Sequence, residues 1–373
     1  MKIAIVCYPT YGGSGVVATE LGISLAERGH EVHFVSYKQP VRLQSLAGNI
    51  HFHEVHVPRY PLFHFQPYEL ALSSMLVEMV RLHQIELLHV HYAIPHAYAA
   101  YMAKQMLKEN GIDIPLVTTL HGSDITLVGS HPFYKPAVTF SINNSDVVTA
   151  VSKDLRSDTF SLFDVHKEIH VVPNFINISR YENIRANCDR ETVAAADEAI
   201  LTHVSNFRPV KRVLDVIETF AKVREHMPAK LMMVGDGPDR LTAENRCREL
   251  DVWEDVVFYG KTNEVSKILF YSDLLLLPSQ TESFGLAALE AMAAATPVIS
   301  TNTGGLPEVN IHGETGYLTA VGDVDAMAKH AVELLSDKEK LALFKDQAYT
   351  YACRFDVHKI VPVYEEMYQK ALA

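Results

Sequence analysis

The sequence predicts an α/β protein of two doubly wound domains that face each other across a cleft. Continuous apolar runs alternate with amphipathic segments along the 373 residues. This alternation is typical of parallel strands that helices bury on both faces. A polar, irregular stretch at 176–197 interrupts the alternation, which then resumes. Hydrophobic residues make up 48% of the chain, which is enough material for two cores.

The first domain is expected to span residues 1–172 and the second residues 173–354. We expect the strands of the first at Ile3–Cys7, Val32–Tyr37, Leu87–His91, Leu116–Leu120, Val147–Val151 and Ile169–Asn174. We expect those of the second at Ile200–Ser205, Leu231–Gly235, Val256–Gly260, Leu274–Pro278 and Val298–Thr301. Ligands of such sheets bind beyond the carboxyl ends of the strands, so functional residues are expected in the loops that follow them.

Charge and cysteine content exclude some classes of function. The net charge of −12 argues against general nucleic-acid binding, which needs a basic surface, and weakly against anionic lipid. The four cysteines, Cys7, Cys188, Cys247 and Cys353, form no C-x-x-C pair and are expected to be reduced thiols of a cytoplasmic protein. No signal peptide and no apolar run of about 18 residues is present, so no membrane association is expected.

A glycine-rich loop, 9–15, follows the first strand and opens a helix at Val16–Arg28. Gly13 and Gly15 let the backbone approach a ligand, and the amides of a helix start favour an anion. The loop also fits a loose G-x-G-x-x-A nicotinamide pattern. That pattern requires an acidic residue at the end of the second strand, where this chain has Lys38. Nicotinamide binding is therefore disfavoured, and a tight turn without a ligand is the plain alternative.

Two glutamates mark the richest loop of the second domain. Glu282 lies in the loop after a buried strand, and Glu290 lies in the helix that starts near Phe284, Gly285 and Leu286. Helix-start amides suit a phosphate and carboxylates suit hydroxyl groups, a combination that a sugar nucleotide requires. Alternatively, Glu282 only complements the helix dipole and Glu290 is a solvated helix residue.

Three cations follow the first strand of the second domain within five positions. They are Arg208, Lys211 and Arg212. At the carboxyl end of a strand such cations suit a diphosphate, although a run of this kind is more often surface charge.

These loops, with the His121-Gly122-Ser123-Asp124 loop and Gly235-Asp236-Gly237-Pro238, occur in the order seen in the retaining GT-B glycosyltransferases of family 4, which the chain resembles. The resemblance implies catalysis without a metal or other cofactor, an acceptor-binding first domain and a nucleotide-sugar-binding second domain. It also implies that the helix expected at 355–373 completes the first domain. A front-face displacement without an enzyme nucleophile is the mechanism that it implies.

The resemblance also implies roles for single residues. His121, Lys211 and Glu282 are the catalytic residues that it indicates. The donor would contact Gly13, Gly15, Asn206, Arg208, Lys211, Glu282, Phe284, Gly285, Leu286 and Glu290. The acceptor would contact Ser14, Tyr92 and Thr119. Relatives often have an arginine where this chain has Asn206, so Lys211 is the safer diphosphate ligand.

Residues 8–22 and 205–212 resemble most closely the family members that act in bacillithiol biosynthesis. This closer resemblance implies transfer of N-acetylglucosamine from UDP-N-acetylglucosamine to the hydroxyl group of L-malate, with retention, and is compatible with a homodimer. A family 4 transferase with another acceptor (an inositol phosphate, a polysaccharide or a lipid) is the alternative within the class. A non-catalytic sugar-nucleotide sensor is the alternative outside it.

Candidate metal ligands are scattered along the chain. Asp323 and Asp325 form a D-x-D pattern, but they precede a helix that Asp323 is expected to cap. The spacings His51-x-His53-x-x-His56 and His89-x-His91 place imidazoles on one face of a strand, yet no third ligand is evident from the sequence. No metal site is predicted.

Overall fold

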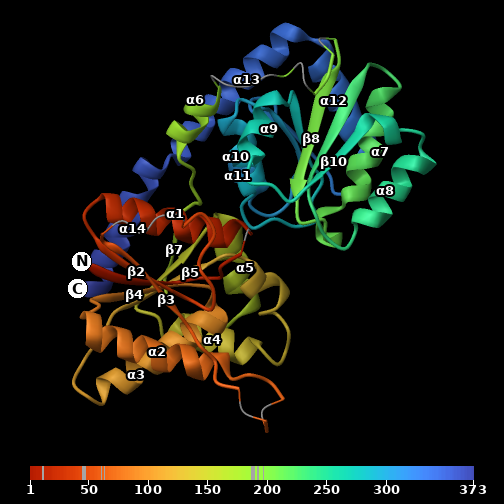
Figure 1. Ribbon diagram of the computed structural model, residues 1–373. Coiled ribbons are helices and arrows are strands. Elements are labelled where there is room, and N and C mark those ends of the chain that lie inside the picture. Colours follow the sequence, from red (N-terminus) through yellow and green to blue (C-terminus); the bar gives the residue numbers. More distant parts are fainter. Residues whose placement is uncertain are drawn as a thin grey trace. The chain divides into compact units, whose positions relative to one another are not determined.

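The computed structural model describes residues 1–373 except 11, 44–47, 60, 63, 186–189, 191–192 and 196. Tyr11 of the glycine-rich loop and Cys188 lie outside the described residues. The chain forms two compact units, one of Met1–Asn174 with Val357–Ala373 and one of Phe175–Asp356. Figure 1 shows a sheet with helices on both sides in each unit.

The described residues of the first unit form a seven-stranded parallel sheet in the order β3-β2-β1-β4-β5-β6-β7. Its strands are β1 (Lys2–Val6), β2 (Glu31–Ser36), β3 (Ile50–Glu54), β4 (Leu87–His91), β5 (Leu116–Leu120), β6 (Val147–Ala150) and β7 (Ile169–Val171). Its α-helices are α1 (Gly13–Glu27), α2 (Tyr68–His83), α3 (Tyr98–Lys108), α4 (Lys135–Asn143), α5 (Lys153–Leu162) and α14 (Val357–Leu372). Short η1 (Ala93–Ala97) and η2 (Ser123–Leu127) follow β4 and β5.

The C-terminal helix α14 belongs to the first unit although it follows the second in sequence. Its buried Tyr368 hydroxyl shares a 2.8 Å hydrogen bond with Nδ1 of His89 in β4. On the helix surface, Glu365 forms an ion pair with Arg28 at the end of α1, 2.7 Å apart. Burial of the tyrosine and the histidine therefore fixes this helix more firmly than the exposed pair does.

The described residues of the second unit form a six-stranded parallel sheet in the order β10-β9-β8-β11-β12-β13. Its strands are β8 (Ala199–Ser205), β9 (Ala229–Gly235), β10 (Val256–Gly260), β11 (Leu274–Leu277), β12 (Val298–Thr301) and β13 (Gly316–Thr319). Its α-helices are α6 (Ile178–Arg185), α7 (Val213–Arg224), α8 (Arg240–Glu249), α9 (Val265–Tyr271), α10 (Leu286–Ala293), α11 (Leu306–Val309), α12 (Val324–Ser336) and α13 (Lys338–Ala352). Among its described residues are also the 3-10 turns η4 (Pro209–Lys211), η5 (Trp253–Asp255) and η6 (Cys353–Phe355).

Both sheets reverse their strand order beside their first strand. In the first unit the chain moves outward from β1 to β3 and then returns to β4, and in the second it moves from β8 to β10 and returns to β11. Loops at such a switch point diverge and leave room for a ligand. The switch points of the two units therefore lie at the β1 and β4 loops and at the β8 and β11 loops.

Two strands, β3 and β13, were not expected from the sequence. β3 is an edge strand in which His51 and His53 replace apolar side chains, and β13 has only four residues. In the described part of the chain, no helix is long and apolar enough to cross a membrane.

Candidate functional site

The switch point of the second unit holds an ion pair between two predicted catalytic residues. Lys211 ends the 3-10 turn η4 after β8, and Glu282 lies in the loop after β11. The Lys211 ammonium group donates a hydrogen bond to Oε1 of Glu282. The two side chains are mostly buried, with 20% and 15% of their surfaces exposed. A cation and a carboxylate are thus held together at the sheet edge where a ligand is expected.

Backbone contacts hold the two loops in this arrangement. The Gln280 amide donates to the Val210 carbonyl at 2.8 Å and links the β11 loop to η4. The Ser279 hydroxyl donates to Oε1 of Glu282 at 3.1 Å. The Gly305 amide donates to the Glu282 carbonyl at 2.8 Å. Lys211, Ser279 and Gly305 therefore hold Glu282 in position before any ligand binds.

Two glycine positions in this unit are needed for close backbone packing. A Cβ at Gly304, whose φ is +58°, would lie 1.9 Å from the Glu282 carbonyl oxygen. A Cβ at Gly237 would lie 1.9 Å from the carbonyl oxygen of Asn206. Gly304 was not predicted as part of the site, and the glycine pair that begins three residues after the buried strand β12 is the signal that could have indicated it.

The other predicted donor residues of the second unit lie in the same two loops or in α10, the helix that follows one of them. Phe284 is buried, and Gly285 caps α10 with a φ of +94°. Leu286 is the first residue of α10 and Glu290 the fifth, and Gly285 is the N-cap, so the amides that lack helical partners lie at 285–288 and do not include that of Phe284. Asn206 and Arg208 are exposed in the β8 loop.

His203, which was not predicted as a site residue, lies in β8, the strand that precedes the turn of Lys211. Its Nδ1 donates to the Leu276 carbonyl at 2.9 Å, and its Nε2 shares a 2.8 Å hydrogen bond with the Ser205 hydroxyl. Burial, with a smaller contribution from Lys211, lowers the pKa of His203 to about 4. The imidazole is therefore neutral at physiological pH and does not compete with Lys211 for an anion.

The switch point of the first unit brings together hydroxyl groups and aromatic rings. Ser14, in the first turn of α1, shares a hydrogen bond with the hydroxyl of Tyr92, which follows β4. Tyr92 has a φ of +86°, a conformation that is strained for a bulky residue and is typically found where function requires it. Its amide donates to the Thr119 carbonyl at 2.8 Å. Two predicted acceptor residues are thus brought into contact.

His121 lies next to Tyr92, with ring centroids 5.1 Å apart. Its Nε2 shares a 2.8 Å hydrogen bond with Nδ1 of His91. The buried Asp124 carboxylate fixes this loop, because it accepts from the Ala93 amide at 2.8 Å and from the Gly122 amide at 3.0 Å. Asp124 therefore ties the β4 loop to the β5 loop, a role that its place in the His121-Gly122-Ser123-Asp124 motif did not reveal.

Burial controls protonation at this edge of the sheet. Together with a smaller contribution from His96, it lowers the pKa of His121 to about 3. The pKa of Asp124 is raised by burial, against the opposing effect of the three backbone amides that it accepts from. His121 is therefore a neutral hydrogen-bonding group at physiological pH.

The structure places three other predicted residues apart from this contact. The Thr119 side chain lies in the core, where its hydroxyl bonds Nε2 of His89 and the hydroxyl of Thr149, each at 2.8 Å. Gly15 is required for loop packing, since a Cβ there would lie 2.5 Å from the Thr10 carbonyl oxygen. Gly13 is exposed at the start of α1.

The D-x-D pattern is a helix cap. The Asp323 carboxylate accepts from the Ala326 amide at 3.0 Å at the start of α12, and the exposed Asp325 pairs with Lys222 at 2.9 Å. The capping interpretation of Asp323 is confirmed.

Comparison with known proteins identifies the family of the chain. Residues 11–180 match the family described as Glycosyltransferase Family 4, and residues 185–351 match the family described as Glycosyl transferases group 1. The chain is 47% identical over 374 residues to N-acetyl-alpha-D-glucosaminyl L-malate synthase of Bacillus anthracis, a match that covers 100% of this chain and 97% of that enzyme.

Solved structures show the same fold at low sequence identity. Sucrose-phosphate synthase of Thermosynechococcus elongatus superposes with a TM-score of 0.81 at 19% identity, over 99% of this chain and 98% of that one. HepE of Anabaena, solved with UDP and glucose, gives a TM-score of 0.82 at 19% identity over 99% of each chain. The chain therefore belongs to the glycosyltransferases of family 4, enzymes of the GT-B fold that take a sugar-nucleotide donor.

Proposed function

We propose that this enzyme transfers N-acetylglucosamine from UDP-N-acetylglucosamine to the hydroxyl group of L-malate, with retention at the anomeric carbon, in bacillithiol biosynthesis. The observation that carries the donor half of this proposal is the Lys211–Glu282 pair beside the start of α10. The substrates come from the malate synthase of Bacillus anthracis, to which the whole chain is similar.

We assign the donor to the second unit. Lys211 would neutralise the diphosphate, together with the amides at the start of α10. Glu282 would accept hydrogen bonds from the sugar hydroxyls and Glu290 from those of the ribose. Asn206 is a neutral donor-binding residue in this assignment, and Arg208 adds charge from an exposed position. Held by Ser279 and Gly305, Glu282 would need little rearrangement when the sugar binds.

We assign the acceptor to the first unit, where Ser14 and Tyr92 offer hydroxyl groups at the start of α1. L-malate carries two carboxylates and needs a cation as well. Arg156 is our candidate, because it is exposed in the first turn of α5, which begins just after the carboxyl end of β6. Lys135 is a weaker candidate for this cation, because it lies at the start of α4, a helix that does not follow a strand directly.

The chemistry needs no enzyme nucleophile. The bond between the anomeric carbon and the diphosphate oxygen breaks, and the malate oxygen bonds to the same face of that carbon. The leaving diphosphate takes the proton of the malate hydroxyl. Lys211 would stabilise the negative charge that develops on the leaving group. The neutral His121 would hydrogen-bond the sugar without adding positive charge beside the oxocarbenium-like centre.

The test is turnover of the purified enzyme with UDP-N-acetylglucosamine and L-malate, followed by mass spectrometry of the product. An inositol phosphate serves as the rival acceptor in a parallel reaction. We expect the malate glycoside, with the α configuration by proton NMR. Donor consumption only with the rival acceptor would contradict the malate assignment. UDP binding without turnover on either acceptor would favour a sensor.

A further inference from the structure

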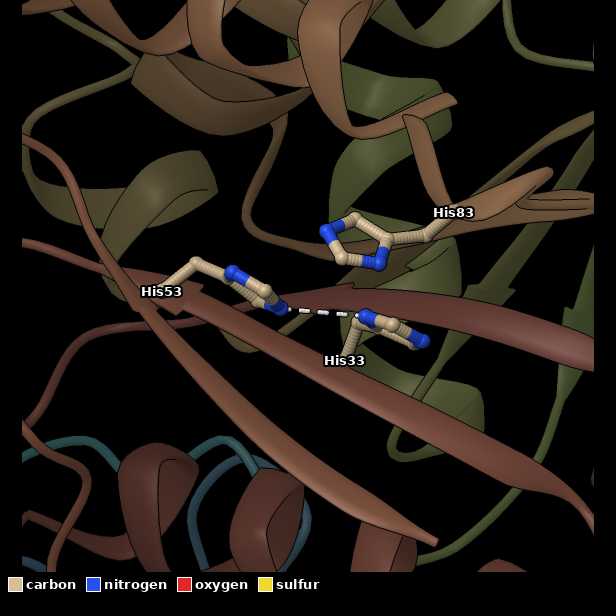
Figure 2. Close-up of side chains that lie close together, drawn as sticks. All are labelled: His33, His53 and His83. Atoms are coloured by element: carbon tan, nitrogen blue, oxygen red, sulfur yellow. Dashed lines mark hydrogen bonds between the residues drawn. The ribbon is translucent and has the colours of Figure 1, made fainter. Parts of the chain in front are cut away.

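The first unit contains a group of histidines that the proposed reaction does not use. His33 lies in β2, His53 in the edge strand β3 and His83 at the end of α2, and we call these three residues the His33 cluster. Each offers a ring nitrogen, and these nitrogens all lie within 4.8 Å of one another. Figure 2 shows the three rings gathered together, with His83 reaching in from its helix.

Strand register explains why the rings meet. β2 and β3 are parallel, with His33 opposite His51 and Val35 opposite His53. Alternate residues of a strand share a face, so the side chains of His33 and Val35 in β2 lie on the same side of the sheet as those of His51 and His53 in β3. Val35 packs in one core cluster with Leu76 and Met79 of α2, so this is the side that α2 covers. The last residue of α2 is His83.

Two hydrogen bonds orient the buried His33 ring. Its Nδ1 lies 3.0 Å from Nε2 of His53, and its Nε2 lies 3.2 Å from Oε1 of Glu31. A carboxylate can only accept, so Nε2 of His33 carries the proton and Nδ1 presents a lone pair toward His53. A carboxylate that fixes the far nitrogen of a histidine in this way is the usual partner of a metal-binding imidazole.

We propose that the His33 cluster binds a divalent transition-metal ion of the zinc class through Nδ1 of His33 and one ring nitrogen each of His53 and His83, with Glu31 as the positioning residue. Three neutral imidazoles suit zinc rather than magnesium or calcium, which prefer oxygen ligands. The fourth coordination position of the ion would be open to water.

The His33–His53 pair needs only a small adjustment to bind an ion, and the ring nitrogen of His83, which lies within 4.8 Å of both, would move toward the ion. Zinc–nitrogen bonds of 2.0–2.1 Å in a tetrahedral site separate ligand nitrogens by about 3.3 Å. The His33–His53 separation of 3.0 Å is near this value. His53 and His83 are half-buried, so their rings can turn toward an ion without disturbing the core. Nε2 of His53 would give up its proton to the other ring nitrogen when the ion binds.

The site lies apart from the catalytic loops of its unit. His33 and His53 lie in β2 and the edge strand β3, which β1 separates from β4 and β5 in the sheet, whereas Tyr92 and His121 follow the carboxyl ends of β4 and β5. The ion would therefore clamp the edge strand β3 to α2 and act on the stability of the first unit rather than on the reaction. This role is independent of the proposed function, because it does not depend on either substrate.

The test is zinc binding to the tag-free full-length enzyme after treatment with a chelator. Competition with a chromophoric chelator measures the affinity, metal analysis after gel filtration measures the stoichiometry, and visible absorption of the cobalt derivative reports the coordination. We expect one ion per chain, a tetrahedral cobalt spectrum and a higher melting temperature with zinc. Magnesium should produce none of these effects.

Variants of the half-exposed ligands avoid loss of the fold. His53→Ala and His83→Ala are expected to weaken zinc binding by more than about 100-fold, and Glu31→Gln by about 10- to 100-fold. The matched control is His56→Ala, which removes an 83% exposed imidazole just after β3 and should leave the affinity unchanged. His51 could instead join Glu31 and His33 in a second arrangement. Zinc binding that His51→Ala abolishes and His53→Ala spares, or binding that no variant weakens, would overturn the proposal.

Discussion

The two units present the same topology and opposite chemistry at their switch points. In each, the loop after the first strand meets the loop after the fourth strand, through Ser14 and Tyr92 in one unit and Lys211 and Glu282 in the other. The first contact joins two hydroxyl groups, with the neutral His121 beside them. The second joins two opposite charges. The fold therefore sets where a ligand can bind, and the loop residues decide which ligand binds there.

This difference suits the two tasks that we assign. A diphosphate leaving group needs a cation, whereas a sugar and a hydroxyl acceptor need groups that donate and accept hydrogen bonds. The second unit therefore carries the larger electrostatic contribution to catalysis, and the first unit contributes positioning.

The largest effect is expected for Lys211→Ala. Loss of the cation at the leaving group should lower kcat by about 100- to 1,000-fold, measured by steady-state release of UDP. The matched control is Arg208→Ala, which removes an exposed cation of the same loop and should cost far less. A greater loss of kcat for Arg208→Ala than for Lys211→Ala would show that the diphosphate is bound by Arg208 rather than by Lys211.

Acid should unfold the first unit before the second. Burial lowers the pKa values of His89, His91, His96 and His121, all in the first unit. Unfolded histidines, with pKa values near 6.5, bind protons that these buried rings do not. Stability is therefore lost as the pH falls below about 6.5. Asp124, whose pKa is raised, opposes this loss because the folded state takes up its proton first.

Hydrogen exchange and fluorescence can separate the two units in an acid titration. The only tryptophan, Trp253, lies in the second unit and stacks on Phe258, so its fluorescence reports that unit. We expect peptides of β4 and β5 to lose protection at a higher pH than the one at which the fluorescence changes. A fluorescence change at a higher pH than the loss of protection in β4 and β5 would contradict the expected order of unfolding.

His121→Asn is expected to lower kcat/KM by about tenfold, the cost of one neutral hydrogen bond or slightly more. The pH profile is the decisive measurement, because a pKa of about 3 leaves the ring neutral from pH 6 to 9. Wild type and variant should therefore have profiles of the same shape. An inflection near 6.5 that only the wild type shows would mean that His121 titrates during turnover.

The smallest effect on activity is expected for Thr119→Val. The hydroxyl group is bonded to His89 and Thr149 in the core, so its loss should cost about 1–3 kcal/mol of stability and leave the KM for L-malate nearly unchanged. Thr118→Val, which removes the hydroxyl bonded to Ser145 at 2.7 Å, is the matched control. A raised KM for Thr119→Val alone would confirm an acceptor contact.

Sequence patterns predicted most strands because buried parallel strands are continuous apolar runs. They failed at β3, whose His51 and His53 look like a polar loop until His33 and His83 are placed beside them. The same limit applies to the site. Lys211 and Glu282 were predicted from their motifs, whereas Gly304, His203 and Asp124 act through contacts between loops that are distant in sequence. Thr119 lies at a strand end, and only the structure shows that its side chain points into the core.

The division of labour between the units is tested most directly by two titrations on the same pair of variants. Calorimetry gives the Kd for UDP, and steady-state kinetics gives the KM for L-malate, for Lys211→Ala and Tyr92→Phe. We expect Lys211→Ala to weaken UDP binding without changing the KM for malate by more than about twofold, and Tyr92→Phe to do the reverse. Weakened UDP binding in Tyr92→Phe with an unchanged KM for malate would contradict the assignment of donor and acceptor.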